Sequence, residues 1–192
     1  MFSTITPVVK NIIFICVGVF ILDKLFANYQ VTERLALWKV GTDLFRPYQL
    51  FTYMFAHGSI GHLFFNMLSL TFMASSLEMV WGFKRFLTFY LVTGIGAAII
   101  YMALEAFLRP HALGMMVGAS GAIYGILVAF GMLFPDREIS LMLPPITIKA
   151  KYLVFVLGFL GYLMDGSHGQ VAHMAHLGGA VTGFFLIKLG RF

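Results

Sequence analysis

The amino-acid sequence predicts an all-α membrane protein, a bundle of six transmembrane helices with a long interfacial loop between the first two. Hydrophobic residues make up 60% of the chain, charged residues only 11%, and the mean hydropathy is +0.90. Soluble domains are roughly half apolar and a quarter charged. Six apolar stretches approach the roughly 20 residues that a bilayer crossing needs. The 192 residues hold these helices and short connections, so we expect one membrane domain over residues 1–192.

The predicted spans follow one another with brief breaks. They cover residues 8–27, 58–80, 85–107, 117–134, 149–165 and 170–189. The first resembles a signal peptide, but its apolar stretch is long and no clear cleavage site follows, so we expect a retained span. Residues 28–57 form the longest connection. Its aromatic residues indicate an amphipathic or re-entrant segment in the membrane interface: Trp38, Phe45, Tyr48, Phe51 and Tyr53.

Lysine and arginine residues predict the orientation of the bundle. Six crossings place both termini on one side. Eight basic residues fall on that side: Lys10, Lys84, Arg85, Arg137, Lys149, Lys151, Lys188 and Arg191. Five fall opposite: Lys24, Arg34, Lys39, Arg46 and Arg109. The positive-inside rule therefore favours cytoplasmic termini, in a bacterial-type plasma membrane.

The charge and cysteine content exclude two classes of function. The formal charge is +5 and the pI about 9.4, but the basic residues are scattered singly among apolar runs, so no nucleic-acid surface is expected. The single cysteine, Cys16, excludes an intrachain disulfide and a cysteine metal site.

Polar side chains within three of the spans are candidate functional groups, because such groups are costly in lipid. They are His62 and Asn66 in the second span, Ser120 in the fourth, and His173 and His176 in the sixth. All three spans begin on the outer side. At 1.5 Å per residue the five side chains lie roughly 5 to 12 Å below the outer surface. The sequence therefore predicts a hydrated, buried site that opens outward.

Small residues recur four positions apart in the fourth and sixth spans, a pattern that permits close helix contact. They are Gly121 and Gly125, and Gly179 and Gly183. Because His176 shares a helix face with the second pair, close packing would bring it within hydrogen-bond reach of Ser120. A serine nucleophile needs a base at that distance. Ser120 also lies in Gly118-Ala119-Ser120-Gly121 at a helix start, where free backbone N–H groups can stabilise an oxyanion.

Four motifs in this order carry a resemblance to a known family. They are Phe45-Arg46, His57-GSIG-His62-LFF-Asn66, the GASG around Ser120, and Ala175-His176-Leu177-Gly178-Gly179. From about residue 45 to 185 the chain resembles the rhomboid intramembrane serine proteases. This resemblance implies a rhomboid-like bundle that hydrolyses a peptide bond in or near the transmembrane segment of membrane-protein substrates. It implies no metal or other cofactor, with substrate and lipid bilayer as the partners.

The resemblance also implies the roles of individual residues. Ser120 would attack the scissile carbonyl, and His176 would act as general base and then acid. His62 and Asn66, with the Ser120 backbone N–H, would hold the oxyanion. No Asp or Glu lies beside His176, and Asp165 comes before a loop, so a Ser-His dyad without an acidic member is expected.

Further positions match supporting residues of the family. Tyr124 stands where an aromatic ring often packs on the catalytic imidazole, and Glu78 where polar contacts anchor a helix. Arg46 matches the arginine of a Trp-Arg pair in the first loop, although Phe45 replaces the usual tryptophan. The glycines Gly118, Gly121, Gly179 and Gly183 would support the site by permitting close approach.

Other interpretations of these residues stay open from the sequence. Ser120 alone is more typical of helix packing, and His62 and Asn66 can simply link helices. His57 is expected to be an interfacial histidine bonded to water or loop backbone, and His173 receives no role. A haem or metal protein would use His57, His62, His173 and His176. A transporter or a non-catalytic rhomboid-like chaperone would also place polar groups in one layer.

Overall fold

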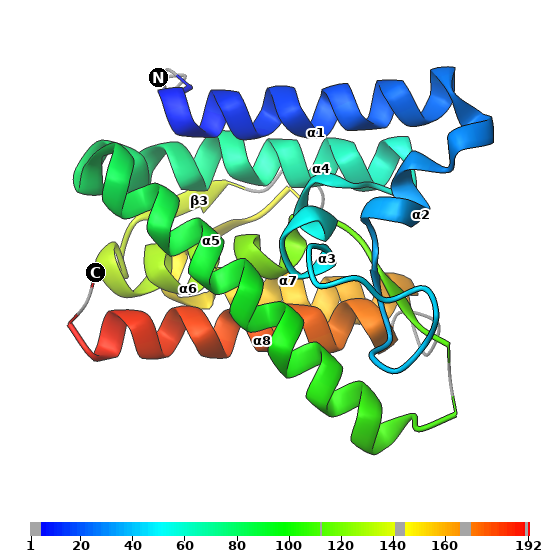
Figure 1. Cartoon of the computed structure of the whole chain (residues 1–192). Helices are drawn as coiled ribbons and strands as arrows, with labels where there is room; N and C mark the ends of the chain where they lie inside the picture. The colour runs from blue at the N-terminus through cyan, green and yellow to red at the C-terminus, as the bar shows by residue number, and fades with distance from the viewer. Residues whose placement is uncertain (1–4, 112, 141–144, 166–169, 191) are drawn as a thin grey trace.

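The computed structural model describes residues 5–111, 113–140, 145–165, 170–190 and 192. Most of them are helical, and the two termini lie at the same end of the bundle (Figure 1). The longer helices are α1 (Pro7–Leu25), α4 (Ile60–Ser69), α5 (Ser75–Leu108), α6 (Ser120–Leu133), α7 (Ala150–Asp165) and α8 (Gln170–Lys188). The shorter elements are η1 (Ala27–Tyr29), α2 (Val31–Leu35), β1 (Leu37–Trp38), α3 (Gln49–Thr52), η2 (Tyr53–Phe55), η3 (Leu70–Ala74), β2 (Met115–Met116), β3 (Glu138–Ser140) and β4 (Thr147–Lys149).

The first turn of α1 is held by a side chain from another helix. Pro7 occupies the first helical position, where its missing N–H is no loss. The carboxylate of Glu78, in α5, accepts from the backbone N–H groups of Val8 and Val9 at 3.0 Å each, and from the Thr6 hydroxyl. A helix start leaves such N–H groups without intrahelical partners. Glu78 therefore caps α1 and joins it to α5. This is the kind of anchoring contact that the family resemblance implies for position 78.

The second and third predicted spans form one nearly continuous helical run, Ile60–Leu108. A π-helical segment, η3, joins α4 to α5. Gly82 has φ 75° and ψ 170°, a conformation that residues with a Cβ rarely adopt, and it breaks the run within the predicted connection. Among the described helices, this run alone meets the length and composition expected of a membrane crossing.

Two short pairs of strands correct the prediction of a chain with helices alone. In the first pair, β1 runs antiparallel to β2 with Leu37 opposite Met116. In the second, β3 and β4 form a hairpin with Ile139 opposite Ile148. Such two- and three-residue strands are set by tertiary contact and leave no periodic signal in the sequence. The β1–β2 pair ties the long first connection to the segment that enters α6.

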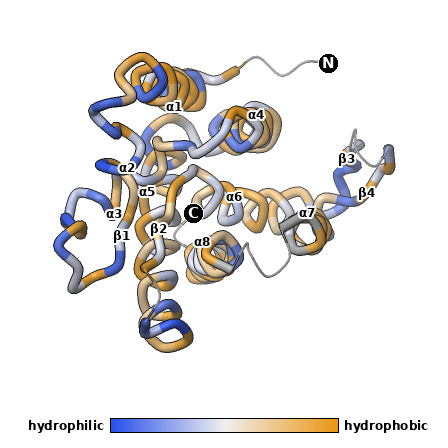
Figure 2. The backbone as a smooth tube through the Cα atoms, turned by 90° about the vertical axis from the view of Figure 1, so that its right-hand side faces the viewer, coloured by the Kyte–Doolittle hydropathy of each residue, from blue (hydrophilic) through white to orange (hydrophobic). Residues whose placement is uncertain are grey.

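Helix α6 packs against α5, α7 and α8 near the centre of the molecule, and α5 and α8 also pack directly on each other. The core around it is rich in large aromatic side chains that are fully buried: Tyr53, Tyr90, Tyr101, Phe86, Phe89 and Phe130. Figure 2 shows α7 and the β3–β4 hairpin on the side away from α1, with hydrophilic segments in the connections from α1 to α3 and in the hairpin. The helices themselves are mostly hydrophobic in the same view.

Candidate active site

The entry into α6 requires glycine at position 118. Gly118 has φ 111°, which favours glycine, and its N–H donates to the Tyr53 carbonyl at 2.9 Å. A Cβ at this position would lie 2.5 Å from Nε2 of His62. Both the turn and the approach of the imidazole therefore need the missing side chain. Ser120 follows as the first residue of α6.

Helices α6 and α8 are in backbone contact along their glycines. A Cβ on Gly179 would collide with the carbonyl oxygen of Gly121, and one on Gly183 would lie 2.7 Å from the Cα of Gly125. Only residues without a side chain permit this separation. The spacing of glycines in the sequence predicts such a seam, and the structure has it.

The seam places a hydroxyl beside an imidazole. Nε2 of His176 and Oγ of Ser120 are 2.9 Å apart, within the range for a nucleophile and its general base. The ring of Tyr124, one turn after Ser120, stacks on the imidazole with centroids 4.0 Å apart and planes 9° from parallel. This stacking limits rotation of the imidazole. His173 lies on the preceding turn of α8, with its ring 6.4 Å from that of His176.

The start of α4 brings His62 and Asn66 to the same region. The Ser59 hydroxyl accepts from the His62 N–H at 3.1 Å and caps this helix. Asn66 is buried, and its Nδ2 donates to the His62 carbonyl at 2.7 Å. That bond uses one of the two N–H groups of the amide. The His62 ring approaches Gly118, two residues before Ser120, so donors from α4 face the start of α6.

His57 is not the interfacial residue that the sequence predicts. Its side chain is 0% exposed. The ring lies edge-on to that of His62, with centroids 5.1 Å apart. Burial, together with the nearby His62, lowers the pKa of His57 to about 4. The correction arises because residues 53–57 are all buried within the protein.

Polar side chains of the first connection form hydrogen bonds to the backbone of that connection. Arg46 is exposed, and its Nη1 donates to the carbonyls of Asp43 and Phe45. Sequence reasoning missed Gln49, which is buried, accepts from the backbone N–H groups of Trp38 and Arg46, and donates to the Leu44 carbonyl. The sequence feature that could have indicated Gln49 is its single amide side chain within an otherwise aromatic and apolar stretch.

Tyr53 is a second residue that sequence reasoning assigned only to the interface. Its hydroxyl donates to the Gly94 carbonyl at 2.7 Å, while its own carbonyl accepts from Gly118. It therefore joins the connection both to α5 and to the entry of α6.

Two other expectations concern an acidic partner for His176 and a metal ion held by the histidines. The side chain of Asp165 lies outside the described residues. Within residues whose placement is described, no group of three His, Cys, Asp or Glu side chains is arranged to hold a metal ion.

Comparison with known proteins identifies relatives over most of the chain. The chain is 34% identical to RHOMBOID-like protein 1 of Arabidopsis thaliana over 72% of its length. It is 31% identical to the mitochondrial Rhomboid protein 1 of Saccharomyces cerevisiae over 67%, and 32% identical to Rhomboid protease GluP of Bacillus subtilis over 72%. The matches cover 33%, 38% and 25% of these relatives, so the chain spans about a third of their length.

The family model for the Rhomboid domain matches residues 44–191. This range contains the α6–α8 seam, the α4 donors and about half of the first connection. A match over this part of the chain implies a helical membrane bundle. The chain is thus a member of the rhomboid family.

Proposed function

We propose that the chain is an intramembrane serine endopeptidase that uses a Ser-His dyad. The observation that carries this proposal is the 2.9 Å separation between Oγ of Ser120 and Nε2 of His176. Serine is a weak nucleophile unless a base accepts its proton. The stacked ring of Tyr124 supports the imidazole, a task that an acidic third residue performs in many triads.

The chemistry follows in two steps. Oγ of Ser120 attacks the scissile carbonyl carbon while Nε2 of His176 takes the hydroxyl proton. The tetrahedral intermediate collapses, the C–N bond breaks, and His176 returns the proton to the leaving amine. In the second step His176 takes a proton from water, the hydroxide attacks the acyl ester, and Ser120 regains its proton as the carboxylic acid leaves.

The negative charge of the tetrahedral oxygen requires donors already in place. The backbone N–H of Ser120, at the start of α6, has no carbonyl one turn earlier within its own helix. His62 and the second N–H of the Asn66 amide approach from α4. Together these groups would form the oxyanion hole, with Gly118 providing the room between them.

In this proposal the site lies within a protein that crosses the membrane six times. Helices α1, α4, α5, α6, α7 and α8 would be the spans, with both termini cytoplasmic and the site opening to the outer side of a bacterial-type plasma membrane. Water would enter from that side, and a transmembrane substrate would enter laterally between helices. A helical peptide bond hides its carbonyl, so the substrate helix must unwind locally.

Cleavage of a model single-span substrate in liposomes tests the dyad. We expect wild type to cleave it, and Ser120→Ala and His176→Ala each to lose activity by a factor of at least about a thousand. Ser69→Ala is the matched control, because the hydroxyl of this half-buried serine donates to the Phe65 carbonyl of its own helix. A fluorophosphonate probe should label wild type and the control but not Ser120→Ala.

The outcomes separate the proposal from its alternatives. Full cleavage by Ser120→Ala would overturn the dyad. A folded wild-type protein that neither cleaves substrates nor reacts with the probe would point to a non-catalytic rhomboid-like chaperone. A Soret band in the visible spectrum of the purified protein would revive the haem hypothesis.

A further inference from the structure

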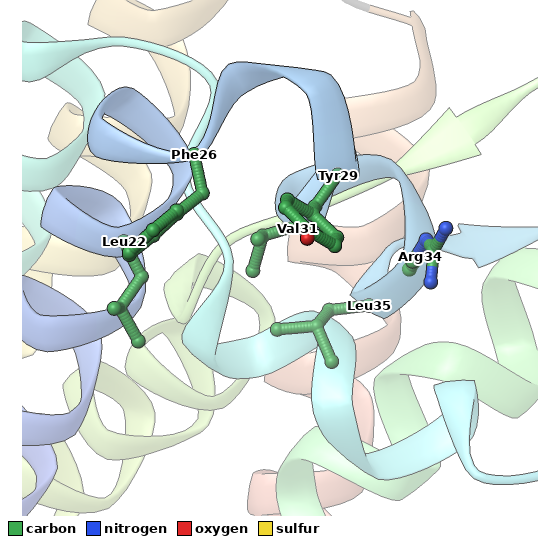
Figure 3. Close-up of a pocket in the computed structure, with 6 residues that line it drawn as sticks. All are labelled: Leu22, Phe26, Tyr29, Val31, Arg34 and Leu35. Carbon is green, nitrogen blue, oxygen red and sulfur yellow. The ribbon is translucent and has the colours of Figure 1, made fainter.

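An open apolar groove lies between the end of α1 and α2, apart from the candidate active site. Its volume is about 420 Å³, within the range of about 300–1,000 Å³ that small-molecule sites occupy. The lining residues are Leu22, Phe26, Tyr29, Val31, Arg34 and Leu35. Figure 3 shows Leu22 and Phe26 at one end of the groove and Arg34 at the other. Arg34 is the only charged group in the lining.

A second hollow, of about 220 Å³, shares Arg34 with the groove and is polar. Glu33, Asp43 and Arg46 contribute its charged groups, and Gln30, Trp38, Leu44, Tyr48 and Gln49 complete its lining. An apolar hollow and a polar one therefore meet at a single guanidinium. This arrangement fits a molecule with a long apolar part and a charged end.

The walls of both hollows are fixed by hydrogen bonds. Oδ1 of Asp23, in the last turns of α1, accepts from the Thr32 N–H at 2.8 Å and holds α2 against α1. The carbonyls of Glu33 and Leu35 accept from Trp38 Nε1 and Thr52 Oγ1, each at 2.8 Å. The short helix α2 is therefore tied at both ends, and the groove exists before any ligand binds.

The Arg34 side chain is free to bind a ligand. Its backbone carbonyl accepts from Tyr48 and Gln49, which fixes the residue, but its exposed guanidinium forms no ion pair with any residue that the structure describes. Glu33 also lines the polar hollow but forms no ion pair with Arg34 in the part of the chain that the structure describes. A guanidinium without an ion-pair partner can bind a phosphate group through two parallel N–H···O hydrogen bonds.

The apolar lining is incompletely covered by protein. Leu22, Phe26 and Tyr29 are 47%, 50% and 61% exposed. They lie where the first span meets the interfacial connection, beside the Asp23–Lys24 ion pair at 3.1 Å. With α1 as the first membrane crossing, an acyl chain would reach the groove and a lipid headgroup would reach the polar hollow.

We propose that the two hollows together bind one glycerophospholipid with an amino headgroup, of the phosphatidylethanolamine class. One acyl chain lies along Leu22, Phe26 and Leu35, and the phosphate binds Arg34. The ammonium group lies in the polar hollow beside the carboxylates of Glu33 and Asp43. The inference concerns α1 and α2 and does not depend on the reaction at Ser120.

Native mass spectrometry of the protein from neutral detergent tests this site. We expect wild type to retain one phosphatidylethanolamine, and Arg34→Ala to bind it about tenfold or more weakly, as for the loss of a charge-assisted hydrogen bond. Arg34→Lys should fall between the two. Arg109→Ala is the matched control, an arginine on the same predicted side outside both linings, and should bind as wild type does.

Binding of two other lipids and labelling by a photoreactive lipid provide further tests of this assignment. Diacylglycerol, which has no phosphate, and phosphatidylglycerol, which has no ammonium, should both bind more weakly than phosphatidylethanolamine. Equal retention of either lipid, or of phosphatidylethanolamine by Arg34→Ala, would overturn the proposal. A photoreactive acyl chain on wild-type protein should label residues 22–35. Labelling spread over all helices would show bulk lipid only, and this arm stands even if a variant fails to fold.

Discussion

At the scale of single residues, two histidines in this protein differ in their surroundings. His176 has a hydroxyl 2.9 Å from Nε2 and an aromatic ring stacked on its plane. His57 is fully buried, with its ring against that of His62. The first arrangement is suited to proton transfer, and the second favours a permanently neutral ring. Each histidine therefore gives its own pH dependence, one in activity and one in stability.

Proteolytic activity should depend on His176 being neutral. An imidazolium has no lone pair with which to accept the Ser120 proton, so kcat/KM should fall about tenfold per pH unit on the acid side of its profile. Initial rates on the model substrate, measured at several pH values while circular dichroism shows the helices intact, provide the check. A rate independent of pH throughout the range of the folded protein would remove His176 from the role of base.

Stability should decline on the acid side because of His57. Its pKa is about 4 in the folded chain and about 6.5 in an unfolded one, so the unfolded state binds the proton first as pH falls. Its contribution is fully present above about pH 6.5 and is lost toward pH 4, by up to about 3 kcal/mol. His57→Phe should remove this loss, as measured by the difference between melting temperatures in detergent at about pH 7 and pH 5.

His111→Phe provides the comparison for that measurement, because His111 is exposed. Its melting temperatures should follow those of wild type at both pH values. If His57→Phe loses as much stability on acidification as wild type does, burial of His57 is not the cause of the acid sensitivity.

At the scale of elements, the contact between α6 and α8 is the feature on which the candidate site depends. Gly121 and Gly179 meet backbone to backbone, and Gly125 and Gly183 do so one helical turn further along. Ser120 and His176 each lie within one turn of the first of these contacts. A change in helix separation is therefore transmitted directly to the Oγ–Nε2 distance.

Gly179→Ala should separate the two helices. The added methyl group would collide with the Gly121 carbonyl, and overpacking of this kind costs about 1–3 kcal/mol. We expect a lower melting temperature and a loss of kcat of about a hundredfold or more, since a displacement of about 1 Å at a catalytic pair can have that effect. Gly18→Ala is the control, because no atom lies within 4 Å of its Cβ position. Normal activity in Gly179→Ala would refute the dependence on this seam.

The elements also show how far sequence reasoning reaches. Apolar stretches predicted the helices, and the four-residue spacing of glycines predicted the seam that brings Ser120 to His176. The β1–β2 pair, the π-helical turn at 70–74 and the burial of His57 were not predictable. Each of these is decided by contacts between distant segments, whereas hydropathy and spacing report only on a residue's neighbours along one helix.

At the scale of the whole molecule, α1 lies outside the matched family domain and is held to it by polar contacts. The Rhomboid domain match begins at residue 44, whereas α1 ends at Leu25. Glu78 supplies three hydrogen bonds to the start of α1. Asp23 supplies another between the end of α1 and α2. The first helix is thus fastened to the rest of the protein at both of its ends.

Glu78→Gln should loosen the first of these attachments. A glutamine keeps the size of the side chain but has one acceptor oxygen, and its NH2 would face the N–H donors of α1. We expect a loss of about 1–3 kcal/mol in stability, seen as a lower melting temperature and faster proteolysis before residue 26. Glu138→Gln, at an exposed position in β3, should leave both measurements unchanged. Equal behaviour of the two variants would contradict the anchoring role.

The contact between α6 and α8 has a consequence for the order in which the protein is made. Ser120 leaves the ribosome 56 residues ahead of His176, so the serine enters the membrane without its base. Under the proposed function, a nascent chain that ends before residue 176 contains Ser120 but lacks the histidine of the dyad. Proteolytic competence would arise only when α8 packs against α6, and until then neighbouring membrane proteins in the process of insertion would be spared.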